Sequence, residues 1–527
     1  MLHSNLPPAS DLSPVALFAV PLRYLHRPLL VLGFLLTLAT AFAQPQPSPT
    51  ERAPAGPLIC RNFLPGKPLN RARRLTPLIA VIENTGSAEV TFRPRLLCPA
   101  GVREVHPFAR GETTLKPGAQ SKLSCEVQAD RAMPVDLALE LWCGDRIAAK
   151  ATLQISFLPP VRIKQAAYIP PPNPVTTTIL VGAHNCPLWE VTAPQMWNEV
   201  VKHPERTPAL GFYDQANPQV ADWETKWAVE HGVNFFVYCW YRNGRADAVE
   251  TMYSSAIEAV LKSRYASQFK FTIMWENQQR GPAGGASGVS SEHELLEPLT
   301  AFWITNYFRQ PSYLKVDNKP LLFIYDAHRL AADLGGVTNV ARAFEQMREA
   351  CRRAGFAGLY LLSEYRGLDP NELRFRKRMG FDYTFAYVWP ISKPEQAVSM
   401  QLDFIRKTRD LDILPEIVTV SQGWTGWRNE GPLYRVPPAA FEGLLREARD
   451  ILATMPEQGL SRKLLLLDNW NEWSEGHYLA PHMQYGFGYL DAVRRVFSDA
   501  PETHVDMIPE DIGFGPYDSG YKARSKK

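Results

Sequence analysis

The chain has 527 residues, of which 45% are hydrophobic and 11% aromatic, so it can bury a large core and is too long for one average domain. Its 57 Lys and Arg residues against 54 Asp and Glu residues leave a formal net charge of +3. A nucleic-acid-binding protein would concentrate basic residues on one face, so this balance gives no reason to expect a nucleic-acid partner.

The amino terminus carries a pattern typical of an export signal. The apolar run "LLVLGFLLTLATAFA" at 29–43 follows basic residues and ends in Ala-Phe-Ala, a small-x-small pattern that signal peptidase reads. The run is shorter than the about 20 residues of a comfortable membrane span. We therefore predict a signal peptide at 1–43, an exported protein in the periplasm or outside the cell, and no membrane association after cleavage. An uncleaved membrane anchor is the alternative.

Seven cysteines are distributed unevenly along the chain. In an exported protein the first four can form two disulfides, whose pairing the sequence leaves open. These four are Cys60, Cys98, Cys125 and Cys143. None of the cysteine spacings resembles a CxxC zinc or haem motif, so we predict neither a metal site nor a cofactor.

Two Pro-rich linkers, at 44–57 and 161–178, divide the chain after the signal. Between them, residues 58–160 show short apolar runs broken by Asn-Thr-Gly, Pro-Ala-Gly and Lys-Pro-Gly turns. This pattern predicts a small all-β sandwich, similar to the immunoglobulin-like accessory modules of exported carbohydrate enzymes.

From 179 to 500, apolar strands alternate with amphipathic helices, and we expect 501–527 to be a tail. The strand candidates are 179–185, 234–241, 269–277, 320–326, 358–365, 381–389, 415–424 and 463–473. Most are apolar throughout, as strands buried on both faces are. Eight β/α units of this length predict an α/β fold, a (β/α)8 TIM barrel. A doubly wound open sheet is the alternative.

Two of the helices carry clear start and stop signals. In 217–232, Asn217 is the expected N-cap and Gly232 the expected stop. In 338–355, Thr338 and Gly355 are expected to do the same.

The active site of such a barrel lies where the strands pass into the following loops. Aromatic rings, carboxylates and amides occupy most of these positions, and together they suit a carbohydrate, whose C–H faces stack on rings while its hydroxyls bind polar groups. Any single ring fits the core equally well, and Asp326 and Glu364 also fit roles as loop caps or salt-bridge partners. The predicted substrate-binding residues are His184, Trp189, Trp240, Tyr241, Trp275, Glu276, Asn277, Tyr325, Asp326, Glu364, Trp389, Trp424, Asn471, Trp473 and His477.

Two glutamates, Glu472 and Glu475, directly follow the last strand in "NWNEWSEGHYLAP" (469–481). If the chain starts a helical turn there, both side chains project to the same side. Two carboxyl groups in one aromatic-lined site cannot easily both ionise, so the pKa of one rises and the pair divides into acid and base. Cleavage of a glycosidic bond requires such a pair. The alternative is a solvated surface pair.

The segment "WNEWSEGHYLAP" resembles the N-E-W-x-E-G-x-x-x-E-P signature of family 99 glycoside hydrolases and of their WbsX-type relatives. The stretches "KPLLFIYD" (319–326) and "RTPALGFYDQANPQVADWETKWAVEHGVNFFVYCWY" (206–241) are similar to further blocks, so the resemblance covers about residues 178–495. It implies a retaining, endo-acting glycosidase on α-mannoside-like chains, without a metal, in which the substrate's own 2-hydroxyl displaces the leaving group.

By motif position, the resemblance implies that Glu472 is the base assisting that hydroxyl and Glu475 the general acid/base, with Asn471 and Trp473 orienting them. Two departures affect expected substrate contacts. The last glutamate of the signature is Ala480, and "AHNCPLW" (183–189) replaces an early Tyr-Tyr-Pro-Trp block. We expect these departures to change the sugar more than the chemistry. A non-catalytic carbohydrate-binding protein and a polysaccharide-assembly transglycosylase of the WbsX type are the alternative functions.

Overall fold

The computed structural model describes residues 57–108, 111–193, 195–244, 247–278, 287–425, 433–501 and 504–521. The expected signal peptide and nearly all of the first Pro-rich linker lie outside the described residues. None of the helices in the described ranges combines the length and the apolar character that a membrane crossing requires.

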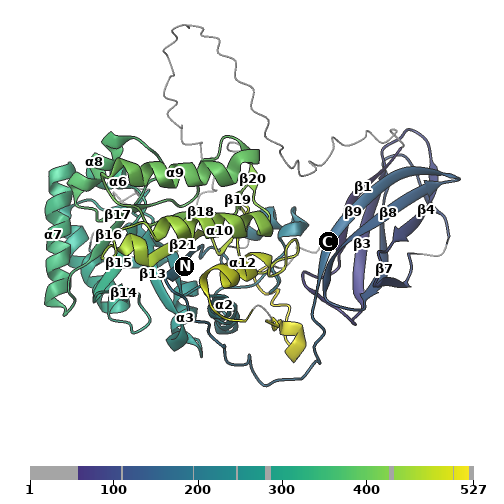
Figure 1. Cartoon of the computed structure of the whole chain (residues 1–527), viewed down its shortest axis with the longest axis horizontal. Helices are drawn as coiled ribbons and strands as arrows, with labels where there is room; N and C mark the ends of the chain where they lie inside the picture. The colour runs from purple at the N-terminus through teal and green to yellow at the C-terminus, as the bar shows by residue number, and fades with distance from the viewer. Residues whose placement is uncertain are drawn as a thin grey trace, which may run out of the picture. The chain divides into compact units, whose positions relative to one another are not determined.

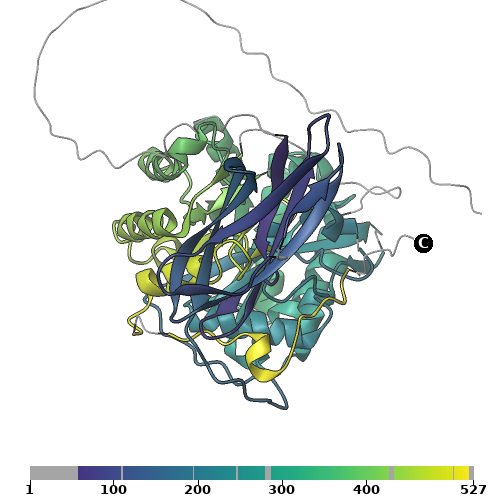
Figure 2. The same ribbon diagram turned by 90° about the vertical axis from the view of Figure 1, so that its right-hand side faces the viewer.

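Nine strands lie between residues 58 and 158 and form two sheets (Figure 1). They are β1 (Leu58–Pro65), β2 (Asn70–Arg71), β3 (Thr76–Asn84), β4 (Val90–Leu97), β5 (Val102–His106), β6 (Thr113–Leu115), β7 (Gln120–Ala129), β8 (Met133–Cys143) and β9 (Arg146–Leu158). The strand orders are β1-β3-β7-β5 and β2-β9-β8-β4-β6. Figure 2 shows the long strands of this region lying side by side.

The two sheets share one hydrophobic core. Along β3, every second residue is fully buried and the residues between are half-buried, which is the pattern of a strand with one face against a core. The region is therefore built as two all-β sheets, and its likeness to immunoglobulin-like modules stays a prediction.

The expected disulfides are not formed. All seven cysteines are described by the structure and all are free. The sheet register explains two of them: Cys60 on β1 lies opposite Ile82 of β3, whereas Cys125 on β7 lies opposite Leu78 on the other side of β3. Two strand spacings already exceed the Cα separation of about 7 Å that a disulfide allows.

Eight parallel strands form the barrel (Figure 1). They are β10 (Leu180–Asn185), β11 (Phe235–Gly244), β13 (Lys270–Trp275), β15 (Lys319–Ile324), β16 (Tyr360–Glu364), β17 (Tyr383–Phe385), β18 (Thr419–Ser421) and β21 (Leu464–Asp468). Their spatial order is β17-β16-β15-β13-β11-β10-β21-β18, and a parallel bridge between Thr384 and Glu416 links the two ends. The nearly closed barrel confirms the predicted α/β fold, and each predicted strand range overlaps one of these strands.

Short antiparallel strands decorate the barrel: β12 (Val249–Met252), β14 (Lys315–Val316), β19 (Gly423–Trp424), β20 (Tyr434–Arg435), β22 (Asn471–Glu472) and β23 (His477–Tyr478). The α-helices are α1 (Gln195–Val200), α2 (Pro218–Glu230), α3 (Ser255–Lys262), α4 (Glu292–Glu294), α5 (Ala301–Trp303), α6 (Ala327–Asp333), α7 (Val337–Arg353), α8 (Pro370–Met379), α9 (Ala397–Leu411), α10 (Pro438–Leu452), α11 (Leu460–Lys463) and α12 (Gly488–Phe497).

The helix signals hold with one exception. The side chain of Asn217 accepts a hydrogen bond from the Gln219 backbone N–H and caps α2, and Gly232 follows the helix with a φ of +84°. Helix α7 begins two residues earlier than expected, so Gly336 and not Thr338 is its N-cap. Gly336 has a φ of +129°, a conformation that glycine adopts without strain.

Residues 504–521, expected to belong to a tail, pack against the barrel. The indole N–H of Trp227 on α2 donates to the Met507 carbonyl oxygen at 2.9 Å, and that of Trp223 donates to the Tyr517 hydroxyl at 3.0 Å. The segment after α12 therefore covers helix α2.

Candidate active site

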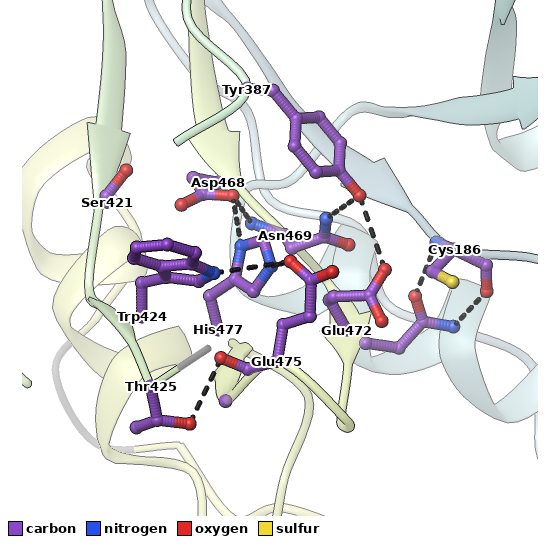
Figure 3. Close-up of polar contacts among 12 residues, drawn as sticks. Cys186, Tyr387, Ser421, Trp424, Thr425, Asp468, Asn469, Glu472, Glu475 and His477 are labelled. Atoms are coloured by element: carbon purple, nitrogen blue, oxygen red, sulfur yellow. Dashed lines mark hydrogen bonds and ion pairs between the residues drawn. The ribbon is translucent and has the colours of Figure 1, made fainter. Parts of the chain in front are cut away.

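The two glutamates lie on a hairpin that follows strand β21. Strands β22 and β23 pair antiparallel, with Glu472 opposite His477, and the Gly476 N–H donates to the Glu472 carbonyl oxygen at 3.1 Å. This bond spans four residues, as in one turn of a helix, and the chain then returns as β23 and does not continue as a helix. Figure 3 shows that the hairpin still carries both carboxyl groups toward the same side, where the Tyr387 hydroxyl lies.

Glu472 is the buried member of the pair, with 6% of its surface exposed. Its Oε1 accepts a hydrogen bond from the Ser474 hydroxyl at 2.9 Å, and the Tyr387 hydroxyl lies 3.4 Å from Oε2. Burial, and then the negative charge of Glu475, raise the pKa of Glu472 to about 7. A carboxyl group in this state is mostly protonated below about pH 7.

Glu475 is the open member, with 37% of its side chain exposed. Its Oε2 accepts hydrogen bonds from the indole N–H of Trp424 and from Nε2 of His477, both at 3.3 Å. Partial burial alone would raise the pKa of Glu475, but the hydrogen bond and the charge of His477, together with the Trp424 bond, bring it below its usual value. Glu475 is therefore ionised in the free protein.

His477 obtains its charge from Asp468, the last residue of β21. The Nδ1 atom of His477 lies 2.7 Å from Asp468 Oδ1, and both side chains are buried. Burial lowers the pKa of His477, but Asp468 and Glu475 outweigh it and raise the pKa to about 10. The imidazolium therefore donates one N–H to each carboxylate and forms a chain from Asp468 through His477 to Glu475 (Figure 3).

Asn471 fixes the hairpin to the end of β10. Its side-chain oxygen accepts the Cys186 backbone N–H at 2.7 Å, and its Nδ2 donates to the Cys186 carbonyl oxygen at 3.1 Å. This two-point attachment holds the backbone beside Glu472.

A second polar group lies at the ends of β13, β15 and β16. The guanidinium of Arg366 donates to Glu364 at 2.6 Å and to the Tyr325 hydroxyl at 3.0 Å. Glu276 is 4% exposed, and burial is the main cause that raises its pKa to about 8, with smaller contributions from the charges of Glu364 and Glu472. Glu276 is therefore a further buried carboxyl group within electrostatic reach of the acid pair.

Five predicted sugar-binding tryptophans are core residues. At most 1% of each side chain is exposed, so none of these rings lies on an accessible wall. They are Trp189, Trp240, Trp275, Trp389 and Trp473. Each indole N–H that has a hydrogen-bond partner bonds inside the protein, as that of Trp473 does to the Tyr213 hydroxyl at 3.0 Å. They belong to the hydrophobic core of the barrel.

Other predicted residues have structural contacts. Asp326 caps α6 by accepting the Arg329 N–H at 2.8 Å, and the side chain of Asn277 bonds both the N–H and the carbonyl oxygen of Asp326. His184 is fully buried against Phe385, and burial lowers its pKa to about 3, so it is neutral. Tyr241 is half-buried and packs on Tyr253.

The sequence interpretation missed Asp468, Tyr387, Ser474 and Arg366. The rule that polar residues at strand ends form the site could have found three of them, because Asp468 ends β21, Tyr387 lies two residues beyond β17 and Arg366 lies two residues beyond β16. Ser474 lies in the turn between β22 and β23, where neither spacing nor residue type sets it apart.

The comparisons with known proteins agree with the resemblance to WbsX-type proteins. The family described as Glycosyltransferase WbsX matches residues 194–421 and 427–493. Two curated relatives, the proteins WxcX from two strains of Xanthomonas campestris pv. campestris, both described as uncharacterized, are 26% and 25% identical over 334 residues. Each match covers 57% of this chain and 45% of the relative, so the chain spans less than half the length of these proteins.

Among solved structures, a GH99 endo-α-mannosidase from Bacteroides thetaiotaomicron has 16% identity and a TM-score of 0.44, over 61% of this chain and 96% of that chain. A β-glucuronidase from Bacteroides uniformis has 10% identity and a TM-score of 0.32, over 82% of this chain and 48% of that chain. These scores are too low to carry conclusions about function. The sequence match to the family covers more than half of the chain, and the chain therefore belongs to the WbsX family.

Proposed function

We propose that this protein is an enzyme that breaks glycosidic bonds, with Glu472 and Glu475 as its acid–base pair. The observation that supports this most is the opposite direction of their pKa shifts on one hairpin at the carboxyl ends of the barrel strands. Two carboxyl groups in different environments, one protonated and one ionised, are what acid–base cleavage of an acetal requires. The position at the strand ends is where barrel enzymes carry catalytic residues.

The roles that the family resemblance implies give a balanced reaction. Glu472 accepts the proton of the sugar 2-hydroxyl, whose oxygen bonds to the anomeric carbon while the glycosidic bond breaks. Glu475 gives a proton to the leaving oxygen. In the second half, Glu475 takes a proton from water, the water oxygen bonds to the anomeric carbon, and O2 leaves and recovers its proton from Glu472.

In the free protein the proton lies on the other member of the pair, since Glu472 has the raised pKa and Glu475 the lowered one. The roles above then require that substrate binding moves one proton. A sugar hydroxyl that donates to Glu472 favours its ionised form, and a sugar that covers the exposed face of Glu475 raises the pKa of that group by desolvation. We propose this transfer as the first step after binding.

The acceptor of the cleaved sugar is water in our main proposal and a second sugar in the alternative. The description of the family as a glycosyltransferase favours transfer, whereas the acid pair serves both reactions.

For the substrate we propose an α-mannoside-like polysaccharide or glycan, cleaved without a metal in an endo-acting, retaining mode. We also propose that the protein is exported.

The test is digestion of α-mannans and purified bacterial polysaccharides by the chain without its expected signal, with reducing ends and product sizes recorded. Hydrolysis gives new reducing ends and shorter chains, whereas transfer gives longer products without a net gain of reducing ends. We expect Glu472→Gln and Glu475→Gln each to lower kcat at least about 100-fold. The exposed Glu457→Gln is the matched control. Equal glycan binding by all variants, with no product from any of them, would favour a carbohydrate-binding protein.

An activated substrate separates the two roles. If Glu475 is the proton donor, Glu475→Gln should regain much of its activity on an aryl glycoside whose leaving group needs no proton. Glu472→Gln should stay inactive on the same substrate. The reverse pattern would assign the proton donor to Glu472, in line with the pKa order of the free protein.

A further inference from the structure

A second cluster of ionisable side chains lies at the opposite end of the barrel from the acid pair. His231 follows α2, just before the chain enters the amino end of β11, and His504 and Asp506 lie in the segment after α12. One ligand atom from each of these three residues lies within 4.8 Å of the others. Asp491 of α12 lies beside this group, with its Oδ1 3.6 Å from Nε2 of His231.

The ring of His231 is held with one nitrogen facing the cluster. Its Nδ1 bonds to the Trp227 carbonyl oxygen at 2.7 Å, which requires the proton on Nδ1, and the ring stacks on Phe487. The lone pair of Nε2 in the neutral ring then points at Asp506. A backbone carbonyl that fixes a histidine in this way is a common outer partner of metal-binding histidines.

Three buried polar atoms of the cluster lie close together: Nε2 of His231, Nε2 of His504 and Oδ1 of Asp506. The two nitrogens lie 3.1 and 3.2 Å from the same Asp506 oxygen. His231 has no exposed surface, so water does not reach its ring. One nitrogen of each neutral imidazole and a carboxylate oxygen that converge in this way can all donate an electron pair to one cation.

We propose that His231, His504, Asp506 and Asp491 bind one divalent transition-metal ion of the zinc class. Bonds of about 2.0–2.2 Å in a tetrahedral site separate the ligand atoms by about 3.3–3.5 Å. The separations of 3.1, 3.2 and 3.6 Å in the cluster bracket this value. Two imidazoles with two carboxylates suit zinc, whereas calcium and magnesium prefer oxygen ligands alone.

This site departs from the expectation of no metal, which was based on cysteine spacing. The four ligands come from positions 231, 491, 504 and 506, so no local motif announces them. The ion would join the end of α2 to α12 and to the segment that covers α2. Because it lies away from the acid pair, its role is structural, and the proposal is independent of the reaction.

A proton is the competing occupant. Burial lowers the pKa of His231, but Asp506 and Asp491 outweigh it and raise the pKa to about 10. In that case a cationic His231 pairs with Asp506 and no metal binds. The two occupants make different predictions, because a metal ion needs His504 and an ion pair between His231 and Asp506 does not.

The experiment uses untagged protein without the expected signal, stripped with EDTA and titrated with Zn²⁺ by calorimetry. We expect one Zn²⁺ per chain, a thermal midpoint raised by at least about 2 °C, and visible absorption typical of a tetrahedral site when Co²⁺ replaces Zn²⁺. His504→Gln should weaken Zn²⁺ binding at least about 100-fold and abolish the rise in the midpoint.

His328→Gln is the matched control, since His328 is an exposed histidine paired with Glu372. It should bind Zn²⁺ as the parent does. Asp506→Asn removes another proposed ligand and should also weaken Zn²⁺ binding. If that variant fails to fold, His504→Gln still provides the test, because His504 is partly exposed. No binding by the parent, or equal binding by His504→Gln and the control, would overturn the proposal and leave the ion pair.

Discussion

Asp468 sets the charge of the acid pair without touching it. The carboxylate keeps His477 protonated, and His477 keeps Glu475 ionised. The relay explains why two glutamates only three residues apart have pKa values shifted in opposite directions. It also means that Asp468, a buried residue at the end of β21, controls the protonation state of Glu475 through His477.

Replacing Asp468 by Asn should therefore change the acid pair from a distance. Without the carboxylate, the pKa of His477 falls and the pKa of Glu475 rises, so the acidic limb of the pH profile of kcat/KM should move to higher pH. At neutral pH we expect kcat/KM to fall at least about 10-fold. Circular dichroism checks the fold, and an unshifted acidic limb in a folded variant would contradict the relay.

At the residue scale, the sequence predicts that the two glutamates differ in pKa, but not which of them has the raised pKa or which residues cause the shift. Glu472, Glu475, Trp424 and His477 contact one another or the same partners. Residue type alone could not separate Trp424 from the five buried tryptophans, because a large ring at a strand end suits the core and a sugar equally well. The burial of each ring distinguishes the two roles, and that burial depends on helices that come later in the sequence.

The β22–β23 hairpin is the element that positions the site. Gly476 closes it with a φ of +75°, in the left-handed region. A Cβ atom at this position would lie 2.0 Å from Oγ1 of Thr425. Thr425 in turn donates its N–H to the Glu475 carbonyl oxygen at 2.8 Å and accepts from Arg206 at 2.6 Å. The turn therefore locks the hairpin to the end of the β18–β19 segment.

Gly476→Ala should destabilise the protein by about 1–3 kcal/mol and lower kcat more than it changes KM, because strain and the clash both move Glu475. Gly443→Ala is the paired change. Gly443 lies within α10, and its added Cβ would have no atom within 4 Å, so this variant should be more stable by about 0.5–1 kcal/mol with unchanged activity. Thermal unfolding and kinetics of both variants provide the measurement, and equal effects would argue against a special turn.

At the element scale, the barrel strands and the cap of α2 were predictable because apolar runs and Asn-Pro pairs have few alternative structures. The hairpin was not predictable. A spacing of three residues between glutamates fits the start of a helix as well as a tight hairpin, and only the pairing of Asn471 with Tyr478 selects the hairpin. The disulfides failed for a similar reason, since strand register, not cysteine count, decides which sulfurs can meet.

The whole barrel closes at Glu416. The backbone of this residue bridges to Thr384, while its side chain is 4% exposed and its Oε2 has no hydrogen-bond partner among the described residues. Burial raises the pKa of Glu416 well above its usual value, so the folded protein holds this carboxyl group neutral. Closure of the barrel therefore carries a dependence on pH.

The sign of that dependence follows from proton uptake. Above the pKa of the unfolded chain, about 4.3, Glu416 is ionised when unfolded and protonated when folded, so its contribution to stability falls as pH rises toward the folded pKa. The slope is at most about 1.4 kcal/mol per pH unit. Glu416→Gln removes it, so the thermal midpoint of the variant minus that of the parent should increase between pH 5 and pH 8. A difference that does not vary with pH would refute the assignment.

The pairing of β10 with β21 brings together the first and the last strand of the barrel, with Leu180 opposite Leu464. During synthesis, one edge of β10 therefore stays unpaired until nearly the whole barrel has been translated. Contacts this distant in sequence make folding slow and leave an apolar strand exposed meanwhile. Glu472 and Glu475 follow β21 directly, so the final step of assembly and the completion of the candidate site coincide.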